Sequence, residues 1–102
     1  MKNNTMLELK DTVVGMTSPD YKERFIAEYT QLAIRAKKLK DFLIKIKFSK
    51  QFGVEPPKHD CPVSLLDEQL MTMLAYLVIL KQRAEIEKIE LPKIEDDEKD
   101  EQ

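Results

Sequence analysis

Three side chains that can bind metals or take part in catalysis stand next to one another at His59, Asp60 and Cys61. A structural zinc site needs four ligands, and the sequence contains no other histidine or cysteine. A catalytic cysteine needs an orienting base and oxyanion donors, and His59 is too close to Cys61 in sequence to act as that base. No glycine-rich phosphate loop is present, because Gly15 and Gly53 stand alone. We therefore expect no catalytic residue, no metal, no cofactor and no enzymatic activity.

The charges are strongly segregated, although the net charge is only −2. Residues 35–50 carry seven cations against one anion, whereas residues 85–102 carry nine carboxylates against three lysines. A cationic stretch on a helix is most often a solvated face, and anion binding is the sharper alternative. Duplex DNA is not the anion we expect, since the acidic residues near the C-terminus would repel its phosphates.

Aromatic and cationic side chains that can hold a nucleotide occur in both halves of the chain. If the halves pair as an antiparallel hairpin, the tyrosines and arginine near the start of the first long helix come within reach of Arg83. A structural ion-pair cluster is the alternative interpretation, with Glu28 and Glu87 as its anions. The candidate ligand-binding residues are Tyr21, Arg24, Tyr29, Arg35, Lys37, Lys38 and Arg83.

Helices must position these residues, because a chain with 42% hydrophobic residues, 35% charged residues and only 2 glycines favours an all-α fold. We expect a short helix over about 5–16, which Gly15 near its end and the Thr17-Ser18-Pro19 stretch after it break. Ser18 suits the N-cap of the next helix, and Pro19 suits its first position. Two long helices are expected over about 19–50 and 62–91. A proline-containing connection of about a dozen residues joins them, and Asp60 or Ser64 could cap the start of the second long helix.

Each long helix carries apolar residues at alternating spacings of three and four, which is typical of a coiled-coil seam. The first seam is Phe25, Tyr29, Leu32, Ala36, Leu39, Leu43 and Ile46. The second seam is Leu66, Leu70, Met73, Leu77, Leu80 and Ala84. The seams predict a long antiparallel two-helix hairpin. Residues 45–52 fit either a helix or an extended segment, and we favour helix because the heptad phase continues through Ile46.

The expected organisation is a short N-terminal helix in residues 1–17, a hairpin domain in residues 18–92 and an acidic tail in residues 93–102. The tail is almost entirely charged from residue 95 onward, and we expect it to be disordered.

Self-association is predicted from the middle of the second long helix. Residues 70–80 are apolar on nearly every side, and one neighbouring helix covers only the seam. A second copy would cover the remainder, so we expect a homodimer or a higher oligomer. The candidate interface residues are Leu70, Met71, Met73, Leu74, Leu77 and Val78.

A cytoplasmic location in a bacterial host cell is expected. The single cysteine fits a reducing compartment. Neither a signal peptide nor an uninterrupted run of 18 apolar residues occurs, so no membrane partner is expected.

Several short motifs occur in a fixed order along both long helices, at residues 21–25, 28–29, 31–32 and 35, then 61–62, 65–66, 68–69, 73, 76–77, 80 and 83–84. Together they resemble the motifs of small phage and prophage proteins related to an uncharacterised crAss-like phage protein. This resemblance covers about 18–91 and implies a phage accessory protein rather than a catalyst. Its general design is similar to that of the oligomeric sponges that sequester nucleotide signals of CBASS and Thoeris defence.

The leading hypothesis is therefore an oligomeric anti-defence protein that sequesters a cyclic or ADP-ribose-type nucleotide immune signal. The alternative is an interaction module that docks on a host or phage protein. A nucleic-acid-binding adaptor is the third hypothesis.

Overall fold

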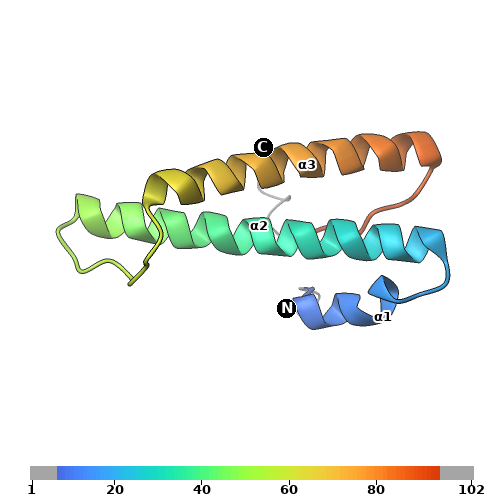
Figure 1. The fold of residues 1–102 in the computed structure, drawn as a ribbon, viewed down its shortest axis with the longest axis horizontal. Coiled ribbons are helices and arrows are strands. Elements are labelled where there is room, and N and C mark those ends of the chain that lie inside the picture. Colours follow the sequence, from blue (N-terminus) through green and yellow to red (C-terminus); the bar gives the residue numbers. More distant parts are fainter. Residues whose placement is uncertain (1–6, 95–102) are drawn as a thin grey trace.

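The computed structural model describes residues 7–94, which form an all-helical fold. A short 3₁₀ helix, η1 (Leu9–Thr12), runs directly into α1 (Val13–Met16), and two long helices follow, α2 (Tyr21–Gln51) and α3 (Val63–Glu87). The long helices lie antiparallel, while η1 and α1 lie on the opposite side of α2 (Figure 1). The predicted all-α fold with a long helix pair and a short N-terminal helix is confirmed, and residues 7–94 contain no strand.

The short N-terminal helix is tighter and shorter than predicted. Helical structure covers residues 9–16, and it starts as a 3₁₀ turn. Residues 5 and 6, where the predicted helix begins, lie outside the described residues. Gly15 allows α1 to approach α2 closely, since a Cβ atom there would lie 3.0 Å from the Cβ of Ala27.

The start of α2 is set by Asp20. Its side chain accepts a hydrogen bond from the backbone N–H of Lys22 at 3.0 Å, which satisfies one of the open donors of the first turn. Ser18 instead accepts from the backbone N–H of Asp20 and donates to Glu23. The predicted cap at Ser18 is therefore wrong, and Pro19 precedes the helix rather than opening it.

The uncertain segment 45–52 is helical through Gln51, which confirms the helical interpretation. Phe52 forms the C-cap, and Gly53 follows with a φ of 68°, a left-handed conformation that glycine adopts at little cost. The chain then leaves the helix and enters the proline-containing connection.

The start of α3 lacks the side-chain cap that the sequence predicts. Pro62 occupies the N-cap position in an extended conformation, with no side-chain hydrogen bond to the first turn. Its backbone carbonyl instead accepts from the N–H groups of Leu65 and Leu66. Neither Asp60 nor Ser64 acts as the cap.

The end of α3 comes at Glu87, earlier than the predicted end near residue 91. Lys88 turns the chain with a left-handed φ of 61°. Residues 89–94 then return along α2, and Ile89 and Ile94 are only 7% and 6% exposed (Figure 1). Ile94, the second residue of the predicted acidic tail, therefore packs in the core, and residues 95–102 lie outside the described residues.

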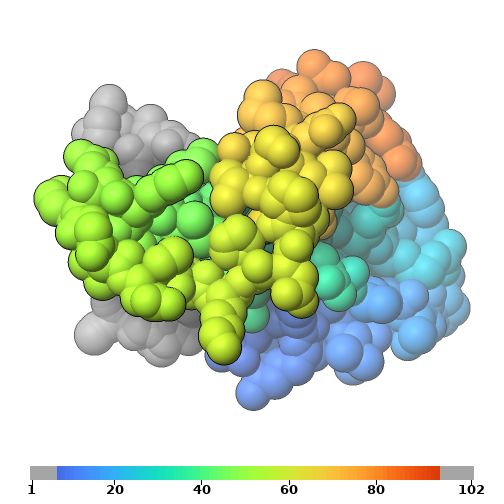
Figure 2. All heavy atoms as spheres, turned by 60° about the vertical axis from the view of Figure 1, so that its left-hand side comes forward, coloured from blue at the N-terminus to red at the C-terminus, as the bar shows by residue number. Residues whose placement is uncertain are grey.

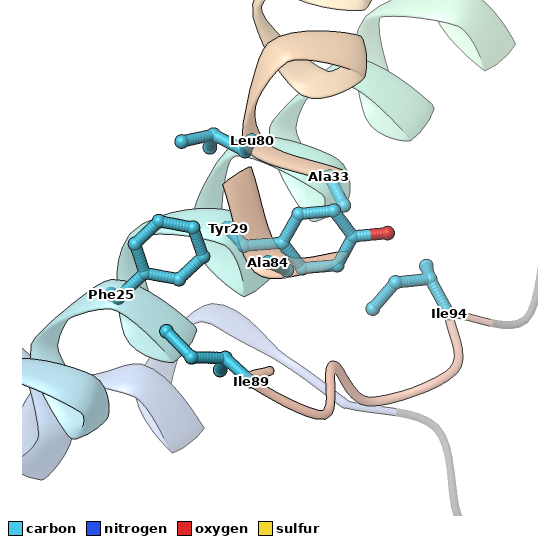
Figure 3. Close-up of a cluster of buried hydrophobic side chains, with 7 residues drawn as sticks. All are labelled: Phe25, Tyr29, Ala33, Leu80, Ala84, Ile89 and Ile94. Atoms are coloured by element: carbon cyan, nitrogen blue, oxygen red, sulfur yellow. The ribbon is translucent and has the colours of Figure 1, made fainter. Parts of the chain in front are cut away.

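The core joins the two helical seams to this returning segment. Its buried side chains, drawn in Figure 3, are Phe25, Tyr29, Ala33, Leu80, Ala84, Ile89 and Ile94. They gather where the start of α2 meets the end of α3. The same packing therefore holds both of these helix ends in place.

Candidate functional site

A hydrogen-bonded cluster joins the first residue of α2 to the last turn of α3. The hydroxyl of Tyr21 donates to the carboxylate of Glu87, and Arg83 donates to the oxygen of that hydroxyl. Arg83 also forms an ion pair with Glu87, with Nε and Oε2 3.0 Å apart. The antiparallel arrangement brings these residues together, and the four-residue spacing on α3 puts both of its members on one side of that helix.

The guanidinium of Arg83 also contacts an aromatic ring of the core. Its Cζ atom lies 4.6 Å from the centroid of the buried Phe25 ring, within the range of a cation–π interaction. The Tyr21 ring packs edge-on against the same ring, with centroids 6.3 Å apart. The hydrophobic core therefore positions both polar groups.

A second tyrosine lies two helical turns further back along α3. The hydroxyl of Tyr76 donates to the carboxylate of Glu28 on α2. Tyr76 and Tyr21 remain 42% and 45% exposed, so both rings are accessible to a ligand. Tyr21, Glu28, Tyr76, Arg83 and Glu87 form one strip across the two helices, which we call the tyrosine–arginine face.

The protonation states of this face are well defined. Hydrogen bonds to Glu87 and Glu28 raise the pKa of Tyr21 and of Tyr76, respectively, so both phenols stay protonated. Hydrogen bonds from Tyr21 and Arg83 lower the pKa of Glu87, and the hydrogen bond to Glu87 in turn raises the pKa of Arg83. At neutral pH the face therefore presents a fixed cation and an ionised carboxylate beside neutral hydroxyl groups.

These groups suit recognition of a ligand that carries both an aromatic base and phosphates. Exposed tyrosine rings can stack on a base, and a guanidinium binds phosphate oxygens in a bidentate manner. The carboxylates can accept hydrogen bonds from ribose hydroxyls or base amino groups. A phosphate must share Arg83 with Glu87, so affinity depends on several contacts made together.

The other candidate residues from the first long helix lie elsewhere. Arg24 is exposed and donates to the backbone carbonyl of Ser18 at 2.8 Å. Tyr29 is only 2% exposed, and its ring lies in the core among Phe25, Ala84 and Ile94 (Figure 3). Its aromatic ring is therefore used for packing, because it stands at a seam position.

The lysines lie on a different side of α2. Lys37 and Lys38 line a cleft of about 580 Å³ between α2, the N-terminal segment and Ile94, and Lys37 forms an ion pair with Asp41 at 3.0 Å. Arg35 is exposed on α2. The structure thus brings Tyr21 and Arg83 together and separates them from Lys37 and Lys38.

The candidate interface residues also divide into two groups. Leu70, Met73 and Leu77 are half-buried seam residues. In contrast, Met71, Leu74 and Val78 are exposed by 66%, 41% and 53%. Only the second group is available to another molecule.

Sequence reasoning missed Tyr76. Its position seven residues before Arg83 is the signal that could have found it, since residues two turns apart lie on the same side of a helix. At the other end of the hairpin, the Nδ1 atom of His59 lies 2.8 Å from the carbonyl oxygen of Cys61. Within residues 7–94, no group of three metal-binding side chains comes together.

Comparison with protein-family models shows that a model described as Sequestin matches residues 19–86, which is 68 of the 102 residues. The matched region contains both long helices except the final residue of α3, and it includes Tyr21, Glu28, Tyr76 and Arg83. No match was found among curated proteins or among solved structures.

Proposed function

The chain belongs to the Sequestin family, and on that premise we propose that it sequesters a nucleotide immune signal of a bacterial host. The family implies sequestration of a signalling molecule rather than catalysis. A protein of this kind would act as a phage- or prophage-derived anti-defence factor in the host cytoplasm. By holding the signal, it would keep the signal from its receptor.

The tyrosine–arginine face is the observation that carries the nucleotide assignment. Two exposed tyrosine rings and a charged arginine lie in one strip, and hydrogen bonds already hold their side chains. This arrangement has separate groups for a base, for a phosphate and for ribose hydroxyls. Cyclic nucleotides and ADP-ribose-type nucleotides carry all three parts.

Sequestration requires binding without turnover. Nucleotide hydrolysis needs an activated nucleophile or a metal-bound water near the phosphate. On the tyrosine–arginine face the hydroxyls remain protonated, and the Glu87 carboxylate is engaged by two donors. The face therefore binds a nucleotide without attacking it, and we expect the ligand to be recovered intact after the protein is denatured.

Isothermal titration calorimetry against a panel of cyclic and ADP-ribose-type nucleotides tests the proposal. We expect one class to bind, and Arg83→Ala to weaken its Kd by at least about tenfold, since a hydrogen bond to a charged group contributes about 1.5–3 kcal/mol. Lys45→Ala is the matched control, because Lys45 is an exposed cation on α2 outside this face. Absence of binding across the panel, or equal effects of the two substitutions, would contradict the proposal.

The alternative function, docking on a host or phage protein, is favoured by the exposed apolar side chains of α3. If that function is correct, substitutions among those side chains will abolish partner binding, and Arg83→Ala will leave it unchanged. The two hypotheses therefore differ in the residues on which they depend.

A further inference from the structure

The most unusual surface of the molecule is the side of α3 that faces away from α2. Its large apolar side chains are Met71, Leu74, Val78, Ile79 and Ile86, and they are 41% to 78% exposed. We call these five residues the outer face of α3. Only Leu80 and Ala84 of this helix are fully buried. Figure 2 shows the atoms of α3, yellow to orange, at the upper edge of the molecule above those of α2.

The outer face repeats the pattern of the inner seam. Met71, Leu74 and Val78 follow one another at spacings of three and four, and Ile79 and Ile86 stand seven residues apart, as do residues that pack against a neighbouring helix. The helix therefore has two opposite packing surfaces in its middle section. A helix with this pattern belongs inside a bundle, with neighbours on both sides.

No segment within residues 7–94 covers the outer face. The N-terminal segment packs against α2, and the returning segment 89–94 packs into the core between the helices. The 14 residues outside the described range contain only two apolar residues, Met1 and Met6. They are too polar to cover a continuous apolar surface.

A membrane is also a poor occupant, although α3 is long and apolar enough to span one by length and composition. The helix is packed along its length against α2, which carries many charges. Glu68 precedes the outer face, and Glu85 stands beside its last residue, Ile86. An apolar centre with a charged border is the usual anatomy of a protein interface.

We infer that the outer face of α3 binds the outer face of a second copy, so that two hairpins form a four-helix bundle. The five side chains are 41% to 78% exposed, and a specific interface, which buries roughly 800 Å² per partner, combines such an apolar centre with the polar residues around it. Such a surface is self-complementary under two-fold symmetry.

The charges fit an antiparallel arrangement of the two α3 helices. Lys81 lies seven residues after Leu74, and Asp67, which pairs with Lys47 of its own chain at 3.1 Å, lies seven residues before it. A two-fold axis near Leu74 therefore sets Asp67 of one copy level with Lys81 of the other, on the same side of the helix pair. This arrangement also places the two helix dipoles antiparallel, which is the favourable orientation.

The second copy would also complete the binding site, a step that rests on the proposed function. Ile79 stands three residues after Tyr76 and four residues before Arg83, so all three lie on neighbouring parts of the helix surface. A copy that covers Ile79 forms a wall beside the tyrosine–arginine face. A ligand held there is enclosed between two chains rather than resting on one open surface.

The test is the mass of the full chain in solution, measured by light scattering after gel filtration at tens of micromolar. We expect twice the chain mass of 11.9 kDa for the natural protein, and a single chain mass for Val78→Glu. Ile44→Glu is the control, since Ile44 is 54% exposed on α2, as Val78 is 53% exposed on α3, and it should remain dimeric. A monomeric natural protein, or a Val78→Glu protein that stays dimeric, would overturn the inference.

Disulfide trapping gives a second measurement that does not depend on the folding of a charged variant. In a Cys61→Ser background, Leu74→Cys should form a covalent dimer under mild oxidation, because an axis near this residue brings both copies together. Ile44→Cys should not. Equal cross-linking of the two variants would overturn the proposed geometry.

The outcomes separate this inference from the proposed function. A dimer that binds no nucleotide leaves the interface standing and removes the function. If monomeric Val78→Glu binds the nucleotide as tightly as the dimer does, the second copy does not help to enclose the ligand, although the proposed function stands. A monomeric natural protein that sediments with lipid vesicles would assign the outer face to membranes instead.

Discussion

The two long helices have similar seams but very different environments. Ten residues of α2 are buried, because α3 packs on one side and the N-terminal segment on another. Only two residues of α3 are buried, although α3 contains the more apolar sequence. In a complete domain the more apolar helix is normally the central one. In a single chain the more apolar helix, α3, therefore lies at the edge of the fold with its outer face exposed.

The largest effect should come from replacing a residue on the one well-buried side of α3. Leu80 is 1% exposed, and Leu80→Ala should reduce the free energy of unfolding by about 2–5 kcal/mol through lost burial and a cavity. Val78→Ala, on the outer face, is the matched comparison. In a monomer its cost should stay below about 0.5 kcal/mol. Urea titration at two protein concentrations would measure both.

The effect of Val78→Ala on stability should depend on protein concentration. If the outer face is an interface, the cost of Val78→Ala should grow as the protein concentration rises, because subunit binding stabilises the folded state by mass action. The effect of Leu80→Ala should remain the larger at every concentration. A Val78→Ala effect equal to that of Leu80→Ala at low concentration would contradict the burial difference.

The returning segment gives the next largest effect, since it completes the cover of α2. Ile94→Ala should destabilise the protein by about 2–4 kcal/mol, because this side chain is 6% exposed within the core. Lys93→Ala, at an exposed neighbouring position, should change stability by less than about 0.5 kcal/mol. Thermal unfolding followed by circular dichroism distinguishes them, and equal melting temperatures would show that the segment does not belong to the core.

The smallest effect concerns the link between the two helix ends, and it depends on pH. The lowered pKa of Glu87 means that its interactions stabilise the folded state above the ordinary glutamate pKa of about 4.3. That stabilisation is lost as the pH falls through the lowered folded-state value. Unfolding midpoints of the natural protein and of Glu87→Gln should therefore differ at pH 7 and converge as the pH approaches 3. A difference that stays constant over this range would show that the carboxylate charge is not the cause.

Heptad spacing was sufficient to predict the hairpin, because a seam that alternates three and four residues is read directly from apolar positions. It also predicted the end of α2 correctly, because the heptad spacing continues through Ile46 although apolar and charged residues alternate locally as in a strand. The end of α3 could not be predicted in this way. Lys88 takes a left-handed conformation that usually belongs to glycine or asparagine, so the composition carries no signal for the turn.

The candidate site was only partly predictable for a related reason. Antiparallel pairing brings Tyr21 to Arg83 whatever the details of packing. Tyr29 belongs to the seam, and burial there is the ordinary fate of a heptad position. Lys37 and Lys38 are separated from the tyrosines by their angle around α2, which the order of residues along the chain does not reveal without assigning the faces of the helix.

The left-handed turn at Lys88 has a consequence for the energetics of binding. Glu87 is the last residue of α3, a place where helices commonly fray. Here Ile89, two residues beyond, is anchored in the core and donates its backbone N–H to the carbonyl of Ala84 at 2.9 Å. The final helical turn is thus clamped on both sides before any ligand arrives. A ligand of the tyrosine–arginine face would therefore bind side chains that are already ordered, and these side chains would lose little conformational entropy on binding.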